Sequence, residues 1–309
     1  MERVYTMNHL SKAFSGIVVP MVSPLLDDHK IDTAAVKRIM MLFASYSVSP
    51  LVLGTTGESP SISEKESLRC MRAACRAKSE NQKVYAGLVG NKVTELLNRA
   101  KMYADMGVDA LVSTLPSYYP LSVDQMRSYY LTLADSVSVP VFMYNIKATT
   151  QMSLPLDLVA DLSQHPNIAG LKDSERDPER LKECIQKYKN RSDFSFFCGW
   201  GAQGANSLIL GSDGIVPSTG NVVPELYYKL YRAVQAGNTD AALHYQQQTD
   251  RVAALYQKDR NLGSSLAALK VLMKARGLCG TAMMPPLTSL SADEEKSITE
   301  QFKKIAKDE

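Results

Sequence analysis

Short apolar runs alternate with amphipathic stretches along most of this chain. The apolar runs predict strands at residues 16–22, 50–54, 83–88, 109–115, 140–145, 168–173, 194–199 and 214–218. The stretches with helical periodicity follow them in turn, at residues 32–46, 63–79, 93–106, 123–136, 155–163, 178–189, 202–210 and 223–235. Because alternating strand and helix units build parallel sheets, and eight such units close a ring, this order predicts a (β/α)8 TIM barrel.

Local signals agree with this reading. The apolar runs are continuous rather than alternating, as is typical of strands covered on both faces. Ser63 and Ser122 each precede a glutamate or glutamine by three residues, which predicts capping boxes, and Asp177 stands directly before Pro178, a common helix start. A doubly wound open sheet is the alternative fold, but the GxGxxG motif of a dinucleotide-binding sheet does not follow the first run.

The pattern changes after residue 237. Helical stretches at 239–257, 263–276 and 292–306 follow one another without apolar runs between them. We therefore expect a barrel domain over residues 13–237 and a C-terminal helical extension over residues 238–309.

The composition is that of an ordinary globular protein, with 309 residues, 45% hydrophobic and 22% charged. The formal net charge of +3 is small and unclustered, and no Lys/Arg-rich run indicates a nucleic-acid partner. No apolar run approaches the length that crosses a bilayer, and the N-terminus lacks the apolar stretch of a signal peptide. We expect a cytoplasmic protein without nucleic-acid or membrane partners, whose N-terminus folds against the body or frays.

Cysteine and histidine usage gives no metal or disulfide signal. The number of cysteines is odd and no pair has CxxC spacing, which predicts reduced thiols. The cysteines are Cys70, Cys75, Cys184, Cys198 and Cys279. The histidines (His9, His29, His165 and His244) are scattered and fit no metal-ligand spacing, so we expect no metal site.

The ends of the predicted strands carry polar side chains. Chemistry in such a barrel sits at the C-terminal ends of the strands. Those ends, or the loops after them, carry "GTTGES" (54–59), "SYY" (117–119), the "YN" that begins at Tyr144, the "LKD" that contains Lys172, and "VPSTGN" (216–221). Hydroxyls, tyrosines and a lysine are therefore expected at one barrel mouth.

Lys172 is unusual because it ends an apolar run. A neutral lysine attacks a ketone or aldehyde to form a Schiff base, and desolvation at a strand end favours the neutral amine. The glycines and the hydroxyls of Thr55 and Thr56 suit a carboxylate, and the phenol of Tyr144 can move protons. Each feature also has a plain structural interpretation: Lys172 could extend to water, "GTTGES" could be a turn and helix cap, and the tyrosines could be packing residues.

"GTTGES", "YN" and "GLKDS", in this order, resemble the motifs of the dihydrodipicolinate synthase / N-acetylneuraminate lyase family. The resemblance covers roughly residues 13 to 290. It implies a (β/α)8 barrel with a C-terminal helical extension, a homotetramer or dimer, and no cofactor. It further implies a lyase of the class I aldolase type, in which a lysine Schiff base with pyruvate, or with a pyruvate-derived unit, serves to make or break a carbon–carbon bond.

The resemblance implies roles for individual residues. Lys172 corresponds to the Schiff-base lysine, Tyr144 to the proton-shuttling phenol, and Thr55 and Thr56 to the pair that binds the pyruvyl carboxylate. Val216 corresponds to a residue whose backbone carbonyl faces bound pyruvate.

One further correspondence concerns subunit contact. Tyr118 corresponds to a tyrosine that reaches into a neighbouring subunit's proton relay. The alignment of "SYYPLS" leaves open whether Tyr118 or Tyr119 has this place.

Two departures concern the substrate. Thr149 stands where the synthases carry an arginine that binds the partner of pyruvate, and Lys147 replaces a usual proline. Residues 201–203, Gly-Ala-Gln, stand where the sialic acid lyases carry an acidic pair, which leaves Ser218 and Asn221 as possible partners for hydroxyl groups. We therefore predict a pyruvate-dependent aldolase or lyase acting on a 2-keto acid, with a 2-keto-3-deoxy sugar acid as one candidate substrate.

Other functions stay open. Within the family these are a true 4-hydroxy-tetrahydrodipicolinate synthase, which joins pyruvate to aspartate semialdehyde, and an N-acetylneuraminate lyase. Outside it are a non-catalytic barrel that binds an oxo acid, and a phosphosugar aldolase or isomerase whose glycine-rich loops at 199–204 and 211–221 would hold a phosphate.

Overall fold

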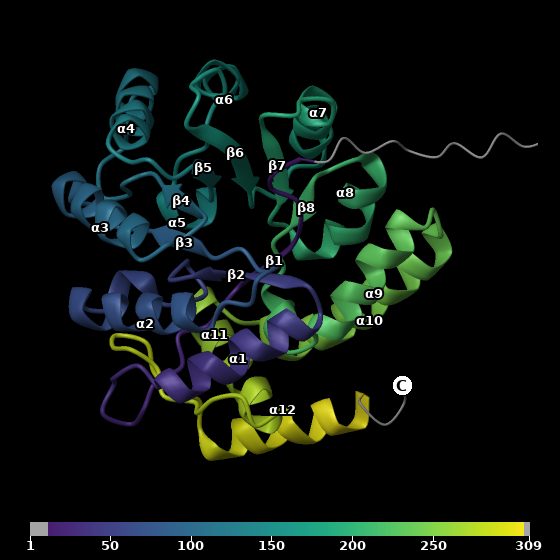
Figure 1. The fold of residues 1–309 in the computed structure, drawn as a ribbon. Coiled ribbons are helices and arrows are strands. Elements are labelled where there is room, and N and C mark those ends of the chain that lie inside the picture. Colours follow the sequence, from purple (N-terminus) through teal and green to yellow (C-terminus); the bar gives the residue numbers. More distant parts are fainter. Residues whose placement is uncertain (1–11, 306–309) are drawn as a thin grey trace, which may run out of the picture.

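Eight parallel strands form a closed barrel, with each strand paired to its sequence neighbours and β8 paired to β1 (Figure 1). The computed structural model describes residues 12–305, so the expectations for the N-terminus and for His9 fall outside the described residues. The strands are β1 (Gly16–Pro20), β2 (Val48–Val52), β3 (Tyr85–Leu88), β4 (Ala110–Thr114), β5 (Val141–Asn145), β6 (Ile168–Asp173), β7 (Ser195–Cys198) and β8 (Gly214–Ile215). The predicted TIM barrel is confirmed.

Helices surround the barrel and continue beyond it. They are α1 (Thr33–Ser45), α2 (Glu64–Ala77), α3 (Val93–Asp105), α4 (Val123–Asp135), α5 (Lys147–Thr150), α6 (Leu156–Leu162), α7 (Pro178–Tyr188), α8 (Gly204–Leu210), α9 (Pro224–Gln235), α10 (Thr239–Gln257), α11 (Leu262–Ala275) and α12 (Ala292–Ile305). Three short 3-10 turns, η1 (Ser59–Ser61), η2 (Gly201–Gln203) and η3 (Ser218–Asn221), follow strand ends. The sequence pattern did not predict α5, because a single helical turn is too short to show a 3.6-residue period.

The predicted helix caps form, with one difference. Ser122 accepts a hydrogen bond in a complete capping box at the start of α4, and Asp177 caps α7. Ser63 accepts from the Glu66 N–H, as predicted, but the Glu66 carboxylate accepts from the backbone N–H of Ile31 at 2.8 Å instead of returning to Ser63. Glu66 thus ties the start of α2 to the loop before α1.

The barrel interior is filled by side chains, as it is in this architecture generally. Its apolar cluster comprises Phe14, Val18, Leu51, Tyr85, Ala110, Val112, Phe142, Tyr144, Ile146, Phe197 and Val216. The rings of Phe142 and Phe197 stack with centroids 5.4 Å apart. A second, larger apolar cluster lies between the strands and the helices. Tyr144 and Val216 are therefore inward-facing residues near the strand ends.

The last three helices pack on one another and on the barrel helices. α10 contacts α8 and α9, and α11 contacts both α10 and α12 (Figure 1). The division at residue 237 stays a prediction, although the helices after it match the predicted stretches to within one residue at each end. Among the described residues, no helix has the length and apolar character needed to cross a membrane.

Candidate active site

The ends of β5 and β6 place two pairs of side chains opposite each other. In the parallel register, Tyr144 pairs with Lys172, and Asn145 pairs with Asp173. Because successive side chains of a strand point to opposite faces, Tyr144 and Lys172 share the inward face, while Asn145 and Asp173 share the outward face. One pair is thus available for chemistry inside the barrel, and the other can anchor it from outside.

Lys172 is buried against Tyr144. Its Nζ atom lies 3.7 Å from the centroid of the Tyr144 ring, and each residue is only 4% exposed. A cation over an aromatic face is attracted by the ring, more strongly where water is excluded. The alternative in which Lys172 extends its ammonium to water is therefore wrong.

The surroundings of Tyr144 favour its phenolate. Burial raises the pKa of this phenol, but the charge of Lys172 and hydrogen bonds with Thr55, Lys172 and Ser174 lower it more, so that the pKa lies below its ordinary value of 10.0. Buried tyrosines elsewhere, such as Tyr85 and Tyr256, have a raised pKa because burial dominates. Tyr144 is thus suited to exchange a proton with the amine beside it.

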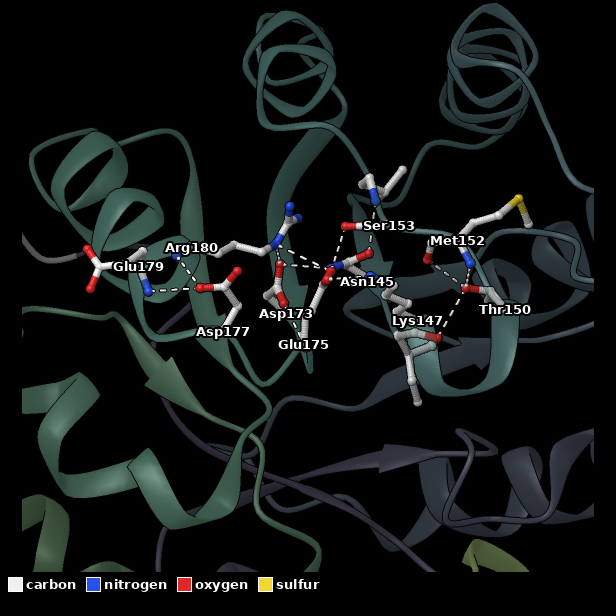
Figure 2. Close-up of polar contacts among 12 residues, drawn as sticks. Asn145, Lys147, Thr150, Met152, Ser153, Asp173, Glu175, Asp177, Glu179 and Arg180 are labelled. Carbon is white, nitrogen blue, oxygen red and sulfur yellow. Dashed lines mark hydrogen bonds and ion pairs between the residues drawn. The ribbon is translucent and has the colours of Figure 1, made fainter.

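An outward network holds the ends of these two strands together (Figure 2). The Asp173 carboxylate accepts from Arg180 Nε at 2.7 Å and from Asn145 Nδ2 at 3.1 Å. Asn145 Nδ2 also donates to Glu175 at 2.9 Å, and Asn145 Oδ1 accepts from the backbone N–H of Leu154. Because Asn145 and Asp173 directly follow Tyr144 and Lys172, this network fixes the spacing of the inward pair.

Glu175 links this network to α5. In Figure 2 its carboxylate lies among Ser153, Asn145 and Lys147. It accepts from Ser153 at 2.5 Å and lies 3.5 Å from Lys147 Nζ. Burial raises the pKa of Glu175, but its hydrogen bonds with Ser153 and Asn145 and the nearby cations lower it more, so the pKa falls below its ordinary value. The Lys147 ammonium, the cation nearest to Thr149 in sequence, is therefore paired with a carboxylate.

The turn after β2 carries the two threonines. Thr56 is buried and Thr55 is half-buried, with its hydroxyl bonded to the Tyr144 phenol. The turn is tight, since a Cβ on Gly57 would lie 3.1 Å from the Met21 carbonyl oxygen, and a Cβ on Gly87 of β3 would lie 2.2 Å from the Leu53 oxygen. Glycine at both places lets the backbone bring Thr55 to the Lys172–Tyr144 pair.

A buried ion pair anchors this turn to the C-terminal helices. Glu58 adopts left-handed backbone angles (φ 56°, ψ 24°), and its carboxylate lies 2.5 Å from Lys270 Nζ of α11. Both side chains are at most 1% exposed. Glu58 also accepts from the Met284 N–H at 2.7 Å, while Lys270 donates to the Ala282 carbonyl at 2.7 Å. The pair therefore joins the threonine turn to residues more than 200 positions away.

The remaining predicted binding residues differ in their surroundings. Val216 is buried in the interior cluster that contains Tyr144. The Ser218 hydroxyl lies 2.7 Å from that of Tyr256. Asn221 is fully buried, accepts from the Val22 N–H and donates to the carbonyls of Pro20 and Ser218. Asn221 is therefore a structural residue, and its suggested contact with a substrate is wrong.

Tyr118 and Thr149 are both exposed. Tyr118 is 74% exposed and packs edge-on against Tyr119, which is 72% exposed, in the loop after β4. The Tyr118 N–H donates to the Asn91 side chain. The Thr149 side chain is exposed on α5, with its hydroxyl 3.4 Å from the Ile146 carbonyl oxygen. A role for Tyr118 in a neighbouring subunit stays a prediction.

The thiols are free and carry no sign of nucleophilic activation. Burial raises the pKa of Cys198, beside the barrel mouth, to about 11, and that of Cys70 to about 12. Within residues 12–305, no group of three His, Cys, Asp or Glu side chains could hold a metal ion.

Three functional candidates were missed in the sequence. Ser174 contacts the Tyr144 phenol, and its Oγ lies where a Cβ on Gly199 would be, only 2.1 Å away. Its place two residues after Lys172 could have drawn attention to it. Glu58 and Arg180 gave no such signal, because their partners come from distant segments or from the outward face.

Comparisons with known proteins agree with this geometry. The model of the dihydrodipicolinate synthetase family matches residues 13–305. An uncharacterized DapA-like lyase of Thermococcus kodakarensis is 29% identical over 92% of this chain and 97% of its own. The solved dihydrodipicolinate synthase of Bacteroides thetaiotaomicron superposes with a TM-score of 0.89 at 28% identity, covering 95% of this chain and 99% of that one. The pyruvate complex of YagE, a prophage protein of the dihydrodipicolinic acid synthase family from E. coli K12, gives the same TM-score and coverage at 25% identity.

The first prediction concerns the ionisation of Tyr144. Replacing Lys172 with methionine removes a positive charge from the ring face, so the pKa of Tyr144 should rise. Ultraviolet difference titration should show one tyrosine ionising below the ordinary value of 10.0 in the native protein, and that component should disappear in both Lys172→Met and Tyr144→Phe. Superimposable titration curves for the three proteins would contradict the assignment.

The second prediction concerns the ion pair between Glu58 and Lys270. Lys270→Met leaves a buried carboxylate without its cation, which should lower the free energy of unfolding by about 3–5 kcal/mol, measured by urea denaturation. The double variant Glu58→Gln/Lys270→Met should recover much of the loss, since no buried charge remains.

Lys274→Met is the matched control for this pair. Lys274 lies one turn further along α11, its side chain is 58% exposed, and it pairs with Glu295 at 3.0 Å. Its loss should cost less than about 1 kcal/mol. If Lys270→Met and Lys274→Met lower the free energy of unfolding equally, the buried ion pair contributes no more to stability than an exposed one.

Proposed function

Because the chain belongs to the dihydrodipicolinate synthetase family, we propose that it is a pyruvate-dependent class I aldolase that forms a Schiff base on Lys172. The observation that carries this proposal is the burial of the Lys172 amino group against Tyr144. The Tyr144 phenol is in turn hydrogen-bonded to Thr55 and Ser174. A structural lysine would have its charge paired with a carboxylate, as Lys270 has. Lys172 forms no ion pair with a carboxylate among the described residues, and faces a proton acceptor instead.

The first chemical steps follow from this arrangement. The Tyr144 phenolate takes a proton from the Lys172 ammonium, and the free amine attacks the ketone carbon of the 2-keto acid. The carbinolamine gains a proton at its hydroxyl group and loses water to give the Schiff base. In cleavage, the bond between C3 and C4 breaks, its electrons move into the Schiff base to form an enamine, and the C4 hydroxyl loses a proton to release an aldehyde.

The turn after β2 is suited to the other end of the substrate. The hydroxyls of Thr55 and Thr56, with the backbone N–H groups around Gly57, can hold the carboxylate next to the ketone. Glu58 and Lys270 then act indirectly, by keeping this turn at a fixed distance from Lys172. The proposed reaction needs no cofactor, because the Schiff base between Lys172 and the substrate accepts the electrons.

Thr149 and Lys147 indicate whether the tail of the substrate is charged or neutral. Thr149 cannot make the bidentate, charge-assisted contact by which an arginine holds a carboxylate. The nearby Lys147 ammonium is paired with Glu175, which reduces its value for a second carboxylate. This supports a 2-keto-3-deoxy acid with a neutral, hydroxylated tail as the substrate.

One observation favours the synthase as second candidate. Lys147 is 60% exposed and lies 3.5 Å from the Glu175 carboxylate, so its ammonium can leave that ion pair and turn toward an anionic aldehyde. In that case pyruvate would condense with aspartate semialdehyde.

The third prediction concerns Tyr144. Tyr144→Phe keeps the ring that packs on Lys172 but removes the phenol, so pyruvate should still bind while kcat falls by roughly a hundredfold or more, the scale for an acid–base group. Steady-state kinetics on the best substrate, with pyruvate binding measured by calorimetry, would check this. Unchanged turnover would show that another group transfers the proton, and Tyr118 would be the next candidate.

The fourth prediction tests the substrate class. Two lost hydrogen bonds to a charged group, at about 1.5–3 kcal/mol each, correspond to a hundredfold or more in selectivity. In one preparation, kcat/KM for pyruvate release from neutral-tailed 2-keto-3-deoxy acids should therefore exceed kcat/KM for condensation with aspartate semialdehyde. If condensation is faster by tenfold or more, the protein is better described as a synthase. Lys147→Ala would then show whether Lys147 replaces the arginine that the synthases carry at the position of Thr149.

A further inference from the structure

A cleft on the outer surface between α1 and α2 is lined by cations. The two helices are neighbours around the barrel (Figure 1). The cleft has a volume of about 460 Å³, which lies within the range of small-molecule sites. Its lining residues are Thr33, Lys37, Arg69, Arg72, Ala73, Arg76 and Ala77. We call it the arginine cleft.

The spacing of these residues explains why the linear sequence hides the cluster. Arg69, Arg72 and Arg76 are three and four residues apart, so they lie on one face of α2. Thr33 and Lys37 are four residues apart on α1 and line the same cleft. The expectation that basic residues are unclustered is therefore wrong for this surface. A search for runs of consecutive Lys and Arg cannot detect a helical stripe.

Acidic side chains do not line the cleft in the described part of the chain, although the charge of Arg69 is, after Lys30, among the influences that lower the pKa of Asp28. Among residues 12–305, none of the four cations in the lining forms an ion pair. The acidic groups near its rim already have partners: Asp28 pairs with Lys30 at 2.6 Å, and Asp32 lies 3.8 Å from Arg38. The carboxylate of Glu66 accepts from a backbone N–H.

The shape of the cleft suits an extended anion. Ala73 and Ala77 are small, which leaves room between the long basic side chains. Arg69 and Arg76 are seven residues apart, about 10 Å along the helix axis, so a single phosphate cannot contact the whole stripe. Like charges at this spacing repel one another in the empty cleft, and an anion between them would remove that repulsion.

We propose that the arginine cleft binds a small polyphosphate, either inorganic or carried by a nucleotide. Guanidinium groups bind phosphate oxygens through two parallel hydrogen bonds, and three arginines in a row match two or three linked phosphates. Lys37 adds a fourth charge, and the Thr33 hydroxyl, at the start of α1, is a further donor. This site is separate from Lys172 and does not depend on the proposed aldolase activity.

The test is calorimetric titration of the full-length protein with tripolyphosphate, ATP and orthophosphate. Tripolyphosphate should bind once per chain, and orthophosphate at least tenfold more weakly. Similar affinities for ATP and tripolyphosphate would assign recognition to the phosphates alone, whereas tighter binding of ATP would assign a nucleotide; either result supports the site.

The decisive variant is Arg69→Gln/Arg72→Gln/Arg76→Gln. It should weaken binding of tripolyphosphate tenfold or more, because each arginine contributes a charge-assisted hydrogen bond. The control is Lys101→Gln/Lys187→Gln/Arg251→Gln, which removes the same charge from three exposed positions on α3, α7 and α10. The control protein should bind as the native protein does.

Four results would overturn the proposal. The first is that tripolyphosphate does not bind the native protein, and the second is that both triple variants weaken binding equally. The third is that binding disappears at about 0.15 M salt, where surface charges are screened. The fourth is that the arginine variant changes its oligomeric state while its affinity for tripolyphosphate stays the same. The last would assign the cleft to contact between subunits.

Discussion

The amino group of Lys172 lies against the face of the Tyr144 ring inside a closed barrel, and the rest of the site depends on that contact. A lysine ammonium loses hydration when it is buried, so such a contact persists only where the surroundings repay the loss. Here the ring face of Tyr144 does so, and the phenol of the same residue lies beside the amine. The contact that makes burial of the lysine tolerable also places its amine beside the phenol that the proposed reaction needs.

Two polar systems outside the barrel interior hold this contact in place. The network around Asp173 and Arg180 joins the ends of β5 and β6, which carry Tyr144 and Lys172. The buried pair of Glu58 and Lys270 joins the threonine turn to α11. The C-terminal helices are therefore part of the support of the site, because they fix one wall of it.

The sequence predicted the elements that have a local signal. Continuous apolar runs marked all eight strands, and the lysine at the end of one of them marked the candidate site. It did not predict α5, which is one turn long, or the partner of Glu58, which lies 212 residues further along the chain at Lys270. It also missed the arginine cleft, since that cluster exists only after the helix has brought every third or fourth residue to one face.

The central claim is that Lys172 forms a covalent Schiff base with a 2-keto acid. The most direct measurement is reduction with borohydride in the presence of pyruvate, followed by intact mass and peptide mass spectrometry. We expect one added pyruvate unit per chain, located on Lys172, and none on the Lys172→Met protein. No added mass on the native protein, or a label on a different lysine that persists in the variant, would contradict it.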